Sequence, residues 1–290
     1  MNRLSFTVIA PSSTLGQDLL DAGAQWLRDQ GHKVSFHEQT SKVLHQSAGT
    51  HDDKIHALHD SFSNPEVDVI LCAVGGNRAL HLLDKIDYDL IAKNKKPFIG
   101  FSDATALLNA LWVKSGIPTI HGPTLNRFAK MDNEQLQQCI DLATYKPTYI
   151  PIDQASVISN GKVKGQVIGG NLSVFQALCG TQYIPDFKGK VLFLEDIGDE
   201  MSRYDRMMGQ LRLCGAFDEC SAVLFGNISE SKDTGRKPFG FTLDDMINEH
   251  CANVKGPIIK DMPFGHIGDF WSLPIGKEIE VNTEETKIIL

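Results

Sequence analysis

An apolar strand, a serine and a helix follow one another between residues 96 and 105, which read Lys96-Pro97-Phe98-Ile99-Gly100-Phe101-Ser102-Asp103-Ala104-Thr105. Gly100 and Ala104 are small and lie two positions before and two after Ser102. A strained strand-to-helix turn that presents a nucleophilic serine needs small residues there, because the neighbouring backbone is crowded. Serine and aspartate are also favoured helix caps, so simple capping is the alternative for Ser102 and Asp103.

Strands and helices alternate on both sides of this turn. The pattern predicts strands at 6–10, 33–36, 67–73, 97–101 and 117–121, and helices near 19–31, 51–62, 78–83, 104–114 and 133–143. Such alternation is typical of an α/β fold with a parallel sheet covered on both faces. We therefore expect residues 1–144 to form an N-terminal α/β domain that carries Ser102.

The pattern changes after Thr144. Turn-forming residues cluster without helical periodicity, which indicates a linker over residues 145–164. Beyond it, strands are predicted at 163–168, 190–194 and 222–225, with helices just after 171 and near 206–214. Residues 165–290 are thus expected to form a smaller, mixed C-terminal domain.

Composition excludes several classes of protein. The 290 residues are 42% hydrophobic and 22% charged, as in a globular chain of two modest domains. The net charge of −8 disfavours nucleic acid as a partner. No apolar stretch approaches the roughly 20 residues that span a bilayer, and the start lacks an export signal, so we expect a cytoplasmic protein without a membrane partner. The six cysteines contain no CxxC pair, which favours reduced thiols.

A glycine pair follows the predicted strand 67–73, in the sequence Val74-Gly75-Gly76-Asn77. Glycines at the end of a parallel strand let a ligand or reaction intermediate approach the backbone, although an ordinary tight turn would use them too. The pair completes neither a GxGxxG nor a Walker loop, so nucleotide binding of those kinds is disfavoured.

Two further signals lie beyond the expected linker. The strand 190–194 ends in Glu195 and Asp196, and an acid in such a place can orient an imidazole, although a turn or cap acid is the alternative. His266 lies in a loop rich in Gly and Pro, where solvent exposure is the alternative to a catalytic role.

Three histidines are candidate metal ligands, namely His51, His56 and His59. The charged residues Asp52, Asp53, Lys54 and Asp60 lie among them, which favours a solvated helix face. No metal and no other cofactor is expected.

Taken together, the motifs closely resemble the LD-carboxypeptidase family of serine peptidases, which includes microcin-immunity hydrolases. The resemblance covers nearly the whole chain and rests on Val74-Gly75-Gly76, 86–91, Gly100-Phe101-Ser102-Asp103, His121-Gly122-Pro123, 169–173, Leu194-Glu195-Asp196, Tyr204-Asp205-Arg206, Gly265-His266 and 273–276. It implies an N-terminal domain like that of class I glutamine amidotransferases, a β-rich C-terminal swivelling domain, and a homodimer.

The resemblance also assigns roles by position. It implies that Ser102 is the nucleophile, His266 the general base and Glu195 the acid that orients it. The backbone N–H groups of Gly76 and Asp103 would form the oxyanion hole.

The activity it implies is hydrolysis of an L,D-peptide bond, such as that of the terminal D-Ala of cytoplasmic murein tetrapeptide, in peptidoglycan recycling. The alternatives are hydrolysis of an aminoacyl-nucleotide antibiotic, a non-catalytic module that sequesters its ligand, and a generic α/β-hydrolase esterase.

Two arginines and an asparagine are candidates for contacting the substrate. Arg206 and Arg78 are candidates for pairing with a substrate carboxylate, beside Asn77, although a surface or structural salt bridge is the alternative for each arginine. Family members of the immunity type carry an aromatic-rich insertion near the linker that stacks on a nucleobase. This chain has only Tyr145 and Tyr149 between 144 and 165, which favours a small peptide substrate.

Overall fold

The computed structural model describes residues 3–268 and 270–290. The chain divides into two compact units, which are described separately. The first unit runs to Lys146 and takes in Ser272–Gly276, and the second comprises Pro147–Trp271 and Lys277–Leu290. Among the described residues, none of the helices has both the length and the apolar character to cross a bilayer.

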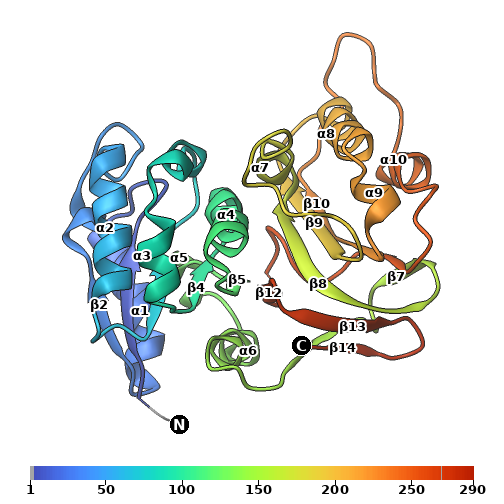
Figure 1. Cartoon of the computed structure of the whole chain (residues 1–290). Helices are drawn as coiled ribbons and strands as arrows, with labels where there is room; N and C mark the ends of the chain where they lie inside the picture. The colour runs from blue at the N-terminus through green and yellow to red at the C-terminus, as the bar shows by residue number, and fades with distance from the viewer. Residues whose placement is uncertain (1–2, 269) are drawn as a thin grey trace. The chain divides into compact units, whose positions relative to one another are not determined.

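The first unit is built on a six-stranded sheet with the order β12-β5-β4-β3-β1-β2 (Figure 1). Its strands are β1 (Ser5–Ile9), β2 (Lys33–Phe36), β3 (Val69–Cys72), β4 (Phe98–Gly100), β5 (Thr119–His121) and β12 (Leu273–Ile275). All neighbours pair in parallel except β12, which runs antiparallel to β5. The predicted parallel sheet is thus present, with one antiparallel edge strand added.

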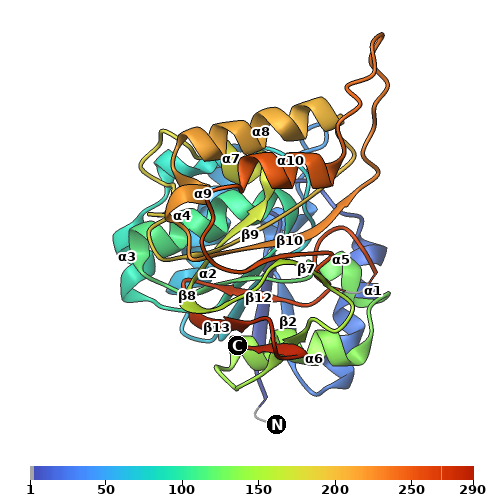
Figure 2. The ribbon, with the colours of Figure 1, turned by 90° about the vertical axis from the view of Figure 1, so that its right-hand side faces the viewer.

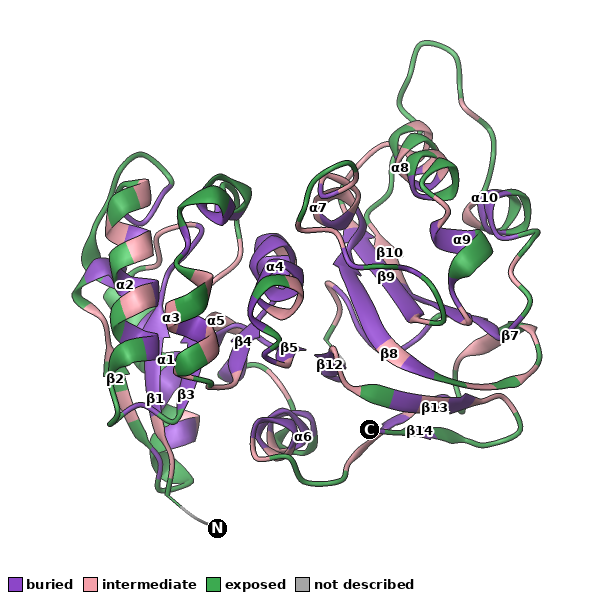
Figure 3. Cartoon of the chain, viewed as in Figure 1, coloured by how far each residue is buried: buried purple, intermediate pink, exposed green. Residues whose placement is uncertain are grey.

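Central strands of this sheet read as continuous apolar runs because both faces are covered. Every residue of β3 and β4 is buried (Figure 3). The helices of the unit are α1 (Gln17–Asp29), α2 (His51–Ser63), α3 (Tyr88–Lys93), α4 (Thr105–Ser115), α5 (Leu125–Phe128) and α6 (Asn133–Ala143), with 3₁₀ turns η1 (Glu38–Ser41), η2 (Ala79–Lys85) and η3 (Ser102–Ala104).

The second unit contains an eight-stranded mixed sheet with the order β6-β14-β13-β8-β9-β10-β11-β7. Its strands are β6 (Tyr149–Pro151), β7 (Ser156–Ser159), β8 (Lys162–Asn171), β9 (Val191–Ile197), β10 (Ala222–Ser229), β11 (Ile258–Lys260), β13 (Glu278–Asn282) and β14 (Lys287–Ile289). The helices are α7 (Leu172–Gln176), α8 (Met201–Leu213), α9 (Ala216–Glu219) and α10 (Leu243–His250). Helices α8 and α10 lie side by side (Figure 2).

The segment 145–164, expected to be a linker, contributes strands β6 and β7 and the start of β8 to the second unit. Strands β6 and β7 are the two edges of the eight-stranded sheet. Edge strands tolerate proline and turn-forming neighbours, so their composition is hard to distinguish from that of a linker.

Candidate active site

Ser102 occupies a strained turn at the end of β4. Its φ of 60° lies in the left-handed region that non-glycine residues rarely adopt. A Cβ at Gly100 would lie 2.8 Å from Ala104 Cβ, and one at Gly75 would lie 2.9 Å from Ser102 Cβ. The glycines therefore make room for this turn, as the sequence predicts for a nucleophilic serine.

Asp103 does not act as a helix cap. The positions that precede η3 and α4 are Phe101 and Ala104, and neither carries a side-chain cap. The buried carboxylate of Asp103 instead accepts a hydrogen bond from Ser12 Oγ at 2.5 Å and one from the Ala79 N–H at 2.9 Å. Asp103 thus ties the serine turn to the segments that follow β1 and β3.

A buried lysine supports this arrangement. Lys54 on α2 is only 1% exposed, and its Nζ donates to the Ser12 carbonyl at 2.7 Å. Burial raises the pKa of Asp103, whereas the bonds from Ser12 and Ala79 and the charge of Lys54 oppose that rise. The expectation that Lys54 belongs to a solvated helix face is therefore wrong.

The glycine turn after β3 lies against two segments, one carrying Ser13 and the other carrying Ser102. Gly76 has a φ of 130°, and a Cβ there would lie 1.9 Å from Ser13 Oγ. The Ser13 N–H donates to the Gly75 carbonyl at 3.2 Å. Only glycine fits at position 76, and its backbone is exposed close to the Ser102 turn.

In the second unit the structure pairs Glu195 with His266. Glu195, near the end of β9, is 0% exposed, and its Oε2 lies 2.8 Å from His266 Nδ1. Burial raises the pKa of Glu195, whereas the hydrogen bond and charge of His266 oppose that rise. With Glu195 ionised, Nδ1 carries the proton of the neutral ring and Nε2 carries the lone pair.

Asp196 has a different task from its neighbour. Its carboxylate accepts from the backbone N–H groups of Ser173 and Ile197 and from the Asn171 side chain, at 2.7 to 3.1 Å. Asp196 therefore anchors the start of α7, and the paired acids separate into a structural one and one that orients an imidazole.

The predicted substrate contacts are distributed over both units. Arg206 is exposed on α8, whereas its neighbour Tyr204 is buried and accepts from the Asp199 N–H at 3.0 Å. Asn77 and Arg78 are exposed directly after the glycine turn, and Arg78 Nη2 donates to His51 Nε2 at 3.1 Å.

The histidines considered for a metal do not gather. His51 contacts Arg78, His56 contacts Asp60, and His59 Nε2 accepts from the Asp87 N–H at 2.9 Å. A different trio of His37, His56 and Asp60 places its ligand atoms within 4.8 Å of one another. In this arrangement His37 Nδ1 accepts from the Gln39 N–H, so the neutral ring keeps its proton on Nε2, the atom that faces Asp60. That tautomer is unsuited to ligating a metal through Nε2.

The fold and these residues define a two-unit α/β protein with a strained serine turn in one unit and a glutamate–histidine pair in the other. Residues 7–122 match the model of the LD-carboxypeptidase N-terminal domain, and residues 164–281 match that of the C-terminal domain. The chain belongs to the LD-carboxypeptidase family.

Relatives and solved structures agree with this assignment. The chain is 30% identical to a probable murein peptide carboxypeptidase of Bacillus subtilis, over 98% of this chain and 90% of that protein. It is 24% identical to the microcin C7 self-immunity protein of Escherichia coli, over 98% and 91%. The solved muramoyltetrapeptide carboxypeptidase of Oxalobacter formigenes matches with a TM-score of 0.87 and 26% identity, over 98% of this chain and 97% of that one.

Proposed function

We propose that the protein is a serine carboxypeptidase that hydrolyses an L,D-peptide bond, such as that of the terminal D-Ala of murein tetrapeptide. The observation that carries the proposal is the left-handed φ of Ser102 in a turn walled by Gly75 and Gly100. Strain of this kind is retained where it positions a reacting group. The murein carboxypeptidase names of relatives supply the substrate class.

In this mechanism Ser102 Oγ attacks the carbonyl carbon of the scissile bond, and His266 Nε2 accepts the hydroxyl proton. The backbone N–H groups of Gly76 and Asp103 stabilise the oxyanion. His266 then donates the proton to the leaving D-amino acid, and water hydrolyses the acyl-enzyme by the same route. Glu195 holds the imidazole in the required tautomer and stabilises its charged form.

The proposal requires Ser102 of the first unit to meet His266 of the second. The chain supports this requirement, because Ser272 enters the first unit only six residues after His266. The proposal therefore includes a C-terminal unit that swivels on an N-terminal unit like that of the glutamine amidotransferases.

The second candidate is hydrolysis of an aminoacyl nucleotide, because the self-immunity protein is a full-length relative. The Tyr149 ring lies 5.4 Å from that of Trp271 between centroids, and Lys287 Nζ lies over the Tyr149 ring, 5.3 Å from its centroid. Tyr145 is 64% exposed and is the other aromatic residue of that segment. A single exposed ring offers less stacking than a nucleobase platform, which favours the peptide.

The test is to incubate the purified protein with an L,D-tetrapeptide, its C-terminal amide and an aminoacyl-sulfamoyl adenosine, with products detected by mass. We expect the free tetrapeptide to be cleaved in preference. Ser102→Ala should abolish turnover, because it removes the attacking oxygen, and should leave the melting temperature close to that of the wild type. Retained hydrolysis in this variant would exclude Ser102 as the nucleophile. Cleavage of the nucleotide compound alone would establish the second candidate.

A further inference from the structure

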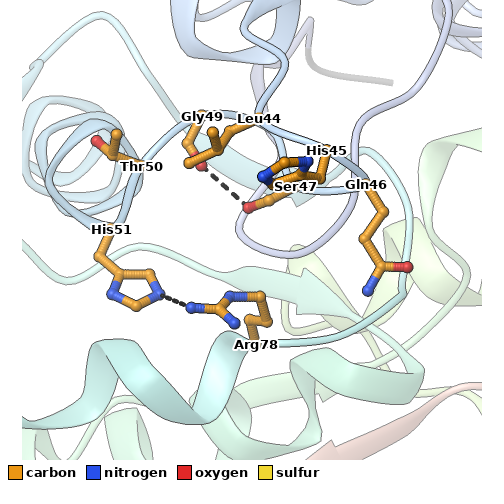
Figure 4. Close-up of a pocket in the computed structure, with 8 residues that line it drawn as sticks. All are labelled: Leu44, His45, Gln46, Ser47, Gly49, Thr50, His51 and Arg78. Carbon is orange, nitrogen blue, oxygen red and sulfur yellow. Dashed lines mark hydrogen bonds between the residues drawn. The ribbon is translucent and has the colours of Figure 1, made fainter.

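A cavity of about 380 Å³ opens in the first unit between the loop 44–51 and Arg78 (Figure 4). We call it the Arg78 cavity. Its polar side chains include His45, Gln46, Ser47 and His51. None of the described residues that line it is Asp or Glu, and Arg78 is its one permanent charge.

The Arg78 guanidinium is held in place. Arg78 has a φ of 85°, a left-handed conformation that is uncommon outside glycine. Because a guanidinium only donates, His51 Nε2 accepts its hydrogen bond. The His51 ring stacks on His81 with centroids 5.2 Å apart and planes 14° apart. An arginine has five N–H donors, so this contact fixes the guanidinium and leaves donors for a ligand.

The surroundings of His51 are positively charged. Burial lowers the pKa of His51, and Arg78, His81, Lys54 and Lys85 lower it further through their charges. The nearby carboxylate of Asp53 is already bound by Lys42 Nζ at 2.7 Å and by Thr50. An anion entering the cavity would therefore meet a positive potential without a competing acid on the wall.

A short chain of contacts connects the loop that lines the cavity to the Ser102 turn. The Thr14 N–H donates to the Gln46 carbonyl at 2.9 Å, and the adjacent Ser13 N–H donates to the Gly75 carbonyl at 3.2 Å. A Cβ at Gly75 would in turn touch Ser102. Arg78 also follows Gly76 by two residues. The cavity and the serine turn thus belong to the same edge of the first unit, joined through Gly75 and the segment that follows β1.

We propose that the Arg78 cavity binds a free carboxylate of the peptide substrate, with the Arg78 guanidinium as its partner. This inference rests on the proposed peptidase function. The carboxylate has two sources, the C-terminus of the leaving D-amino acid or a side chain on the acyl side, and both present the same planar group to the guanidinium.

The experiment measures kcat and KM of the full chain on three tetrapeptides. One is the parent peptide, one has a C-terminal amide, and one lacks a side-chain carboxylate on the residue before D-Ala. Arg78→Gln removes the charge, Arg78→Lys keeps it without the planar fork, and Arg28→Gln on α1 is the matched control. Melting temperatures establish that each variant is folded.

For the parent peptide, Arg78→Gln should raise KM about tenfold or more and change kcat by less than about threefold. The KM of Arg78→Lys should lie between those of the wild type and Arg78→Gln, and the KM of Arg28→Gln should match the wild type. The rise in KM should vanish for whichever analogue lacks the bound carboxylate, which identifies its source. An equal rise for all three peptides, or an unchanged KM, would overturn the proposal.

The peptidase function and the cavity can fail separately. If the wild type cleaves none of the peptides, the proposed function is wrong, and calorimetric titration of the parent peptide and both analogues into the Ser102→Ala variant still tests the cavity. A higher Kd in the Ser102→Ala/Arg78→Gln double variant, for every peptide except the one that lacks the bound carboxylate, would support the cavity as the carboxylate site. Equal Kd values with and without Arg78→Gln, or no binding at all, would overturn it.

Discussion

Glu195 combines complete burial with a bond to His266, and these two facts predict opposite effects on activity and stability. Burial raises the pKa of this carboxyl, so the folded protein binds its proton more tightly than the unfolded chain does. The stability from that protonated form is present at low pH and is lost as pH rises through the raised pKa. Once ionised, the buried carboxylate thus costs stability.

Glu195→Gln should therefore lower kcat by about a hundredfold or more, because imidazolium stabilisation is lost. The variant should melt at or above the wild-type temperature at pH 7, and its advantage should grow between pH 4 and pH 7. Thermal melts across this range and steady-state kinetics check both parts. A variant that melts well below the wild type at pH 7 would contradict the burial argument.

Lys54 is the residue that the sequence misrepresents most. It lies among charged neighbours in the sequence, but it is buried and donates to the carbonyl of Ser12, whose hydroxyl donates to Asp103. Lys54→Met should cost about 1.5–3 kcal/mol of unfolding free energy, because the Ser12 carbonyl loses a charged donor. Lys93→Met, an exposed lysine on α3, is the control and should be neutral. Urea unfolding measures both, and equal stabilities would refute the assigned role.

At the scale of elements, the turn between β4 and α4 depends on Gly100. Adding a Cβ would place it 2.8 Å from Ala104 Cβ and 3.0 Å from Cys72 Sγ. Gly100→Ala should cost about 1–3 kcal/mol through overpacking and should reduce kcat by moving Ser102. Gly16→Ala, where the added methyl would meet nothing within 4 Å, should keep both values near wild type. Denaturant unfolding and kinetics decide, and normal activity in Gly100→Ala would contradict the crowding argument.

The sequence predicted the type of an element correctly where the hydrophobic periodicity agreed with the turn-forming residues at its ends. Helix α2 and strand β2 fall at their predicted positions, and the short helix α7 follows the glycines at 169 and 170. The expected helix near 78–83 is instead the 3₁₀ turn η2, preceded by Arg78 in a left-handed conformation. Periodicity describes which faces are apolar, and it does not report backbone strain of that kind.

The candidate active site likewise contains residues that local sequence patterns predict and residues that they do not. Ser102, Glu195 and His266 follow recognisable local patterns, and the structure confirms the contact between Glu195 and His266. The sequence analysis did not predict the support from Lys54 and Ser12, which depends on contacts across 42 and 91 positions of the chain. Pro11-Ser12-Ser13 after the first strand was the available signal, since it lies at the same sheet edge as the glycine turn.

At the scale of the whole molecule, the first unit is not a continuous piece of chain. Strand β12 pairs with β5 through Leu273 and His121, and both Leu273 and Ile275 are fully buried. Nothing in the local sequence assigns a five-residue segment this late to the N-terminal sheet. Its register follows from the unsatisfied edge of β5, which only the folded sheet creates.

This topology predicts that residues 1–146 alone do not form a stable unit. Losing Leu273 and Ile275 removes about 3–6 kcal/mol of apolar burial, a large share of the roughly 5–15 kcal/mol that stabilises a domain. The fragment should show a broad, early melt by circular dichroism. Joining residues 272–276 to it through a flexible linker should restore a cooperative transition, whereas the same fusion with Leu273→Asp and Ile275→Asp should not. A sharp melt of the bare fragment would show that the first unit folds without its late strand.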